Sequence, residues 1–222
     1  RGMKTPVDIM AWRCSIYLHE APMLHLKCTT PKAWIETALA NLDQVLVDHA
    51  HCEHKAAVTA LALTSQYPDH LPRVRELAAL AQEEAGHFAD MVQICNERGL
   101  QLGRPPKDPY VKALLNQTRQ GYLDHLVDRL LICSIIEARS CERLKLLAEN
   151  LSDAALRKTY DSFWRAEAGH HMLFIRLAEE AVVLHKPTSE KKAKLIVLER
   201  LEQLAEIEAA IVLNEPIRPA IH

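Results

Sequence analysis

Residues 84–87 read Glu-Ala-Gly-His, and the same four residues occur again at positions 167–170. On an α-helix, residues three positions apart share one face, so the glutamate and the histidine of each copy can bind the same metal ion. Each copy also has a glutamate about 30 residues upstream, in a separate stretch of helical character: Glu53 before the first copy and Glu137 before the second. The doubled pattern predicts four helices that bring four carboxylates and two imidazoles together, a ligand set that suits two iron ions.

The pattern assigns a role to each residue of this site. By analogy with other di-iron bundles, Glu84 and Glu167 are expected to bridge the two ions, while each histidine binds one ion. The other two glutamates come from one further helix each. The predicted metal ligands are therefore Glu53, Glu84, His87, Glu137, Glu167 and His170.

Glu83 is the candidate for a supporting contact. A histidine that binds a metal usually donates its second N–H to an acceptor. In such bundles the residue before one Glu-x-x-His motif often faces the histidine of the other half, so Glu83 is predicted to accept from His170. The corresponding residue of the second copy is Ala166, which cannot accept a hydrogen bond from His87. The alternative is that Glu83 is only a solvated surface charge.

Length and composition indicate one globular helical domain. Of the 222 residues, 49% are apolar, 25% are charged and only six are glycine. No apolar run reaches the ~20 residues of a membrane span, and the N-terminus lacks the apolar core of a signal peptide. The six cysteines form no Cys-x-x-Cys pair and indicate reduced thiols. We therefore predict a cytoplasmic protein that does not bind membranes.

Turn residues divide the chain into helices. Pro31 favours a helix start, Pro68 breaks the helix that follows, and Gly99 and Pro187 favour helix ends. Residues 99–108, which contain two prolines, form the predicted crossover between the two halves. The helices that carry ligands are predicted at about 31–66, 69–98, 121–150 and 152–184, and a flanking helix at about 188–214.

The connections predict the fold class. Short loops within each half and one longer crossover between the halves are typical of a ferritin-like four-helix bundle. We predict an all-α protein of this class with flanking helices. Residues 3–29 have no sustained periodicity and are predicted to form an N-terminal extension on the outside of the bundle. A single domain is expected over residues 3–214.

The surroundings of two predicted ligands suggest a pocket. His49 lies one helical turn before Glu53 and is interpreted as a pocket wall rather than a ligand. Small side chains near Glu53 and Glu137 would leave room for oxygen and a substrate, although they would equally allow close helix packing. These small residues are Ala56, Ala57, Cys133, Ser134, Ser140 and Cys141.

Four stretches resemble one known family. They are Val-Asp-His-Ala-His-Cys-Glu-His-Lys-Ala-Ala at 47–57, Glu-Glu-Ala-Gly-His-Phe at 83–88, Ile-Glu-Ala-Arg-Ser-Cys-Glu-Arg at 136–143 and Glu-Ala-Gly-His-His at 167–171. They resemble MiaE, a family of bacterial non-haem di-iron tRNA hydroxylases of the ferritin-like superfamily. The resemblance covers nearly the whole chain, and it departs at His54, where another basic residue is expected.

The resemblance implies a reaction and its partners. The family hydroxylates the isopentenyl group of 2-methylthio-isopentenyl-adenosine, next to the anticodon of tRNA, with two iron ions as cofactor and dioxygen as co-substrate. A separate electron donor, which the sequence does not identify, is also implied. Basic residues could hold the tRNA phosphates, although such residues are more often solvated surface charges. The candidates are Arg104, Lys107, Arg139, Arg143, Lys186, Lys191, Lys192 and Lys194.

Other functions fit the same ligands. Bacterioferritin-like and rubrerythrin-like proteins store iron or handle peroxide, and the ubiquinone-ring hydroxylase is a related oxygenase. The N-terminal segment and the crossover count against a storage cage, so we expect a monomer or a small oligomer. The net charge is −2, but without the four buried glutamates the remaining charges sum to +2, which permits a nucleic-acid partner.

Overall fold

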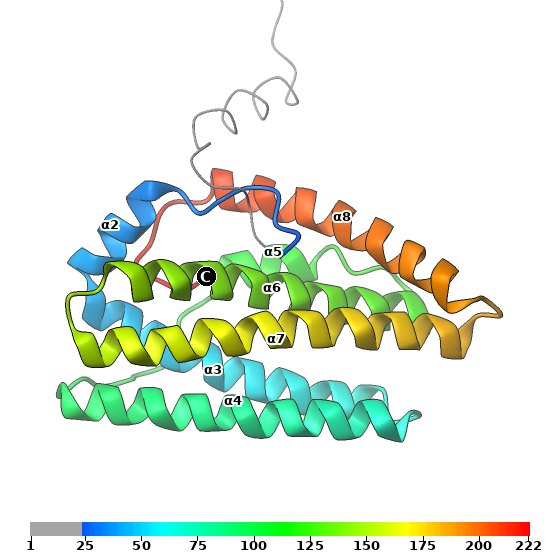
Figure 1. Ribbon diagram of the computed structural model, residues 1–222, viewed down its shortest axis with the longest axis horizontal. Helices are drawn as coiled ribbons and strands as arrows, with labels where there is room; N and C mark the ends of the chain where they lie inside the picture. The colour runs from blue at the N-terminus through cyan, green and yellow to red at the C-terminus, as the bar shows by residue number, and fades with distance from the viewer. Residues whose placement is uncertain (1–23) are drawn as a thin grey trace, which may run out of the picture.

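The computed structural model describes residues 24–222, which form seven α-helices and no strand (Figure 1). The all-α prediction is confirmed. Most of the predicted N-terminal extension, residues 3–23, lies outside the described residues. The helices are α2 (Lys32–Ala40), α3 (Leu42–Gln66), α4 (Leu71–Glu97), α5 (Pro109–Leu115), α6 (Tyr122–Asn150), α7 (Ala154–His185) and α8 (Glu190–Asn214).

Two antiparallel hairpins form the bundle. One is α3 with α4 and the other is α6 with α7, and the hairpins meet where α4 packs beside α7. The long connection between them contains α5. Helices α2, α5 and α8 pack against the second hairpin, so that in Figure 1 α2 (blue) and α8 (orange) lie above α6. These connections are those of a ferritin-like bundle with one long crossover.

Helix ends follow local chemistry. Gly99 has a φ of 69°, and the N–H of Leu100 donates to the carbonyl of Cys95 just after α4 ends. This is the left-handed glycine cap that the sequence predicted for this helix. Asp153 accepts hydrogen bonds from the N–H groups of Ala155 and Leu156 at the start of α7, as expected for an aspartate at a helix N-cap.

The first predicted helix is wrong in one respect. Residues 31–66 form two helices rather than one, because Asn41 leaves helical geometry at φ −131° and ψ 42°. The Asn41 side chain donates to the carbonyl of Thr37. Local bonds of this kind compete with the regular hydrogen bonds of a helix. The bend lets Trp34 of α2 lie in the core, where its indole N–H donates to the carbonyl of Ala220.

The segment 215–222 also belongs to the fold, whereas the predicted domain ended at residue 214. Ile221 is fully buried, and its N–H donates to Asp48 of α3 at 2.7 Å. The Arg143 guanidinium of α6 donates to the carbonyl of Ile221 at 2.8 Å. The segment therefore ties the two hairpins together.

The apolar core has two parts with polar residues between them. Along α3, Leu46 belongs to one buried cluster and Leu63 to the other, and Glu53 lies between them. Leu77 and Leu130 belong to the same cluster as Leu63. Each buried leucine contributes about 2 kcal/mol, so packing on both sides holds the polar layer in place. None of the described helices is long and apolar enough to cross a membrane.

Candidate metal centre

The structure brings all six predicted ligands together near the middle of the bundle. Their side chains form two overlapping groups, and within each group one ligand atom per residue lies within 4.8 Å of the others. Glu84 and Glu167 belong to both groups, as expected of bridging carboxylates. The first group is Glu53, Glu84, His87 and Glu167, and the second is Glu84, Glu137, Glu167 and His170.

The distances show how the histidines face the carboxylates. His87 Nδ1 lies 3.5 Å from an oxygen of Glu53 and 3.5 Å from an oxygen of Glu84. His170 Nδ1 lies 2.8 Å from the other oxygen of Glu84 and 3.2 Å from Glu167. Each histidine thus turns the same ring nitrogen toward the carboxylates of its own group.

The buried charges shift the pKa values of these groups. Burial lowers the pKa of His87, but the adjacent carboxylates of Glu53 and Glu84 outweigh this effect and raise the pKa to about 10. Burial also lowers the pKa of His170, but the carboxylates of Glu167 and Glu84 outweigh this effect and raise the pKa to about 11. Burial raises the pKa of Glu137 well above its usual value, and repulsion from Glu167 and Glu84 adds to this effect. The buried carboxylates of this cluster therefore favour positive charge beside them.

Unpaired polar atoms indicate that the residues fit a metal. Both carboxylate oxygens of Glu84 are buried without a well-aligned hydrogen bond, as are His87 Nδ1 and His170 Nε2. Such groups are costly to bury unless something compensates them. Four carboxylates and two imidazoles are hard and borderline ligands of the kind that bind iron. The cluster therefore suits a di-iron site.

Two residues lie beside the ligands. Glu83 is 53% exposed in its side chain, and one of its oxygens lies 3.5 Å from His170 Nε2, on the side of the ring that faces away from Glu84. His49 is buried, with Nε2 2.5 Å from Glu53 and its ring stacked on Tyr160. The sequence predicted only a pocket wall at His49, although the spacing of four residues from Glu53 places both side chains on one helix face.

A small cavity of about 80 Å³ leads to the ligands between α3 and α6. Four glutamates form its floor, and small or apolar side chains form its walls. The rim is polar. The floor is Glu53, Glu84, Glu137 and Glu167; the walls include Cys52, Ala56, Cys133, Ile136 and Phe174; the rim includes Lys55, Thr59, Asp108, Ser140 and His222.

The small residues have divided roles. Ala56, Cys133 and Ser140 line the cavity, in agreement with the predicted space beside the ligands. Ser134 and Cys141 instead make packing contacts. The Ser134 hydroxyl donates to the carbonyl of His171, and the Cys141 thiol to the carbonyl of Trp164.

The family model described as tRNA-(MS2IO6A)-hydroxylase (MiaE) matches residues 18–222. The chain belongs to the MiaE family. Two curated relatives are each named tRNA 2-(methylsulfanyl)-N(6)-isopentenyladenosine(37) hydroxylase. The one from Pseudomonas putida is 39% identical over 153 residues, which cover 69% of this chain and 74% of the relative. The one from Salmonella typhimurium is 29% identical over 210 residues, and the match covers 72% of this chain and 77% of the relative.

A solved structure supports the fold of this MiaE-family chain. It is Protein 43 with aldehyde deformylating oxygenase activity from Synechococcus, with a TM-score of 0.77 and 35% sequence identity. The match covers 87% of this chain and 92% of the other. The neighbour shares the ferritin-like fold, which confirms the predicted fold class.

Two of the predicted tRNA contacts are wrong for this MiaE-family chain. Arg139 is fully buried and bonds Glu142 and Glu208, and Arg143 is buried over the ring of Trp34. Arg139 and Arg143 lie one helical turn apart on the same face of α6, but α2 and α8 cover that face. The other six candidates are exposed: Arg104, Lys107, Lys186, Lys191, Lys192 and Lys194.

Proposed function

We propose that this protein is an oxygen-dependent di-iron monooxygenase that hydroxylates the isopentenyl group of 2-methylthio-isopentenyl-adenosine at position 37 of tRNA. The observation that carries this proposal is the convergence of the doubled Glu and Glu-x-x-His pattern at the floor of a cavity, in a chain of the MiaE family. The names of the two curated relatives support the choice of substrate.

The six ligands divide between two ions in the proposed site. Glu84 and Glu167 would each bind both ions, whereas the other four residues would each bind one. Two ferrous ions held there would supply two of the electrons that dioxygen needs. In the complete reaction a C–H bond of the prenyl group becomes C–OH, the second oxygen atom leaves as water, and a separate donor provides two electrons and two protons.

The cavity walls orient the substrate. Ile136, Phe174 and Cys133 offer apolar surface directly above the ligand carboxylates, where the prenyl group would be buried. Each buried CH₂ group contributes about 0.8 kcal/mol. The polar rim would then hold the purine, so that only the prenyl carbons reach the oxygen site.

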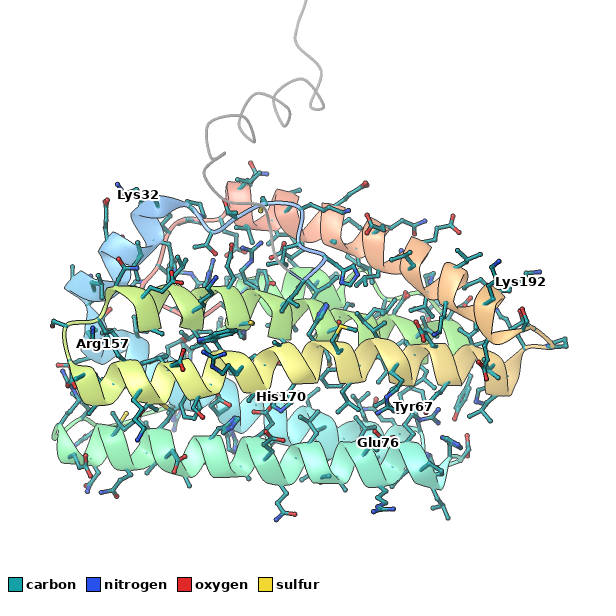
Figure 2. The ribbon with its side chains drawn as sticks, in the orientation of Figure 1. Lys32, Tyr67, Glu76, Arg157, His170 and Lys192 are labelled. Carbon is teal, nitrogen blue, oxygen red and sulfur yellow. The ribbon has the colours of Figure 1, made fainter. Side chains whose placement is uncertain are left out.

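We propose that tRNA lies across the α4–α5 loop. A groove of about 530 Å³ beside the cavity mouth is lined by Asp48, Arg104, Pro106 and Arg218 among others. Arg104 and Lys107 are exposed in this loop, where they would bind phosphates that flank the modified base. Lys192 lies at the end of the bundle, far from His170 (Figure 2), so the lysines of that end would contact only a distant part of the tRNA.

One experiment separates this function from its alternatives. The protein is reconstituted anaerobically with ferrous iron and reduced, then given ¹⁸O₂ and tRNA that contains 2-methylthio-isopentenyl-adenosine. Nucleoside mass spectrometry should show one ¹⁸O atom on the prenyl group. Parallel assays of iron mineralisation and of an aliphatic aldehyde, for loss of its formyl group, test a storage protein and the activity of the Synechococcus neighbour. Activity in either assay without labelled nucleoside would refute the proposal.

A further inference from the structure

His222 lies at the mouth of the cavity above the ligands. Its Nε2 is 2.8 Å from the hydroxyl of Ser140, and its Nδ1 is 3.6 Å from a carboxylate oxygen of Asp108. Its ring stacks on Tyr110, with the centroids 5.5 Å apart and the planes 16° apart. A flat nitrogen heterocycle therefore fills the rim, with an aromatic ring on its face and a hydroxyl at its edge.

The residue next to it is held by its backbone. Ile221 is fully buried, its N–H donates to Asp48, and its carbonyl accepts from Arg143. The side chain of His222 is held through its ring, by a 2.8 Å hydrogen bond between Nε2 and Ser140 and by 3.6 Å contacts of Nδ1 with Cys52 Sγ and Asp108. The imidazole can therefore leave the rim by rotation of its own side chain, while Ile221 keeps the segment in place.

The cavity as it stands is too small for the proposed substrate. It has a volume of about 80 Å³, whereas pockets for small ligands usually measure ~300–1,000 Å³. Because the helices around it are fixed by two packed apolar clusters, the space must come from the rim. Among the rim residues, His222 carries a flat ring whose contacts with Tyr110 and Ser140 a purine can replace.

We propose that His222 is a gate that the purine of the substrate displaces. In the complex, the base takes the position of the imidazole, stacks on Tyr110 and bonds the hydroxyl of Ser140, while the prenyl group enters the cavity. His222 thus sets substrate selectivity, because only a planar base with hydrogen-bonding edges regains the contacts that the gate gives up. This inference rests on the proposed function, since it assumes a prenylated purine as ligand.

The gate lowers the apparent affinity of the protein for its substrate. A protein that is only partly open binds with an affinity reduced by its open fraction. The hydrogen bond to Ser140 corresponds to about a fivefold bias toward the closed form. His222→Ala should therefore bind the free nucleoside 2-methylthio-isopentenyl-adenosine about fivefold more tightly than the unchanged protein.

Calorimetric titration of the full chain, loaded with ferrous iron and kept free of oxygen, tests the gate without turnover. Ile217→Ala is the matched control, because Ile217 is exposed in the same segment. Ser140→Ala completes a double-mutant cycle. In the His222→Ala background, Ser140→Ala should weaken binding about fivefold. In the otherwise unchanged protein, Ser140→Ala should weaken binding much less, because loss of the Ser140 hydroxyl also releases the gate. Circular dichroism and iron content establish that each variant is folded.

The outcomes separate the gate from the proposed function. Equal affinity of the unchanged protein and His222→Ala, or additive effects in the cycle, would overturn the gate and leave the proposed function standing. The gate would also be overturned if His222→Ala bound unmodified adenosine more tightly but not the prenylated nucleoside. If no protein bound the prenylated nucleoside, and labelled tRNA showed no hydroxylation, both proposals would fall together.

Discussion

The two hairpins carry the same ligand pattern in different surroundings. In α6, 18 of 29 residues are buried, because α2, α5 and α8 cover it, whereas ten of 25 are buried in α3, the matching helix of the first hairpin. The position two residues after the ligand glutamate illustrates the difference. In α6 it is Arg139, fully buried and paired with Glu208, and in α3 it is Lys55, partly exposed at the cavity rim. A repeated sequence pattern predicts the candidate ligands but not the role of their neighbours.

Bridging and terminal ligands give the largest expected effect. Glu84→Ala should lose most of both iron ions and all hydroxylation, because Glu84 belongs to both ligand groups. Glu53→Ala should lose mainly the ion of the first group. Glu97→Ala, an exposed change on α4, serves as the control. Iron content after anaerobic reconstitution measures the effect, and equal losses from Glu84→Ala and Glu53→Ala would contradict the bridging role.

The matched positions Arg139 and Lys55 test the difference in burial directly. Arg139→Met should lower the free energy of unfolding by ~3–5 kcal/mol, because it leaves Glu208 buried without its cation. Lys55→Met should change it by only ~0–1 kcal/mol, since the pair of Lys55 with Asp108 is partly exposed. Urea unfolding of the iron-free proteins measures both values. Similar losses would mean that the two hairpins are not as different as their burial indicates.

Glu83 gives the smallest of these effects and occurs in only one hairpin. Glu83→Ala should keep the fold but weaken iron affinity or turnover ~10–100-fold, because His170 loses the acceptor beside its Nε2. Glu76→Ala is a control on the same helix, at a glutamate that pairs with Arg176 away from the ligands. Iron titration and turnover together measure the effect. No change in either would return Glu83 to the class of solvated surface charges.

The sequence by itself predicted the helices and the residues of the candidate centre. Both depend on short-range spacing, since Glu84 and His87 share a face of any regular helix that contains them. The doubled pattern then required four helices to meet, because buried carboxylates need compensating cations. For the same local reason Gly99 was correctly predicted to end its helix.

Only the tertiary structure decided which neighbours of these residues are buried. Arg139 pairs with Glu208, which is 69 residues away in the chain, and the N–H of Ile221 donates to Asp48, 173 residues away. The contact of Trp34 with the carbonyl of Ala220, 186 residues away, is likewise long-range. No local pattern encodes such contacts, because burial is set by whichever helix happens to cover a face. The candidate ligands therefore followed from spacing along the chain, whereas the burial of the arginines and the position of His222 followed from packing across it.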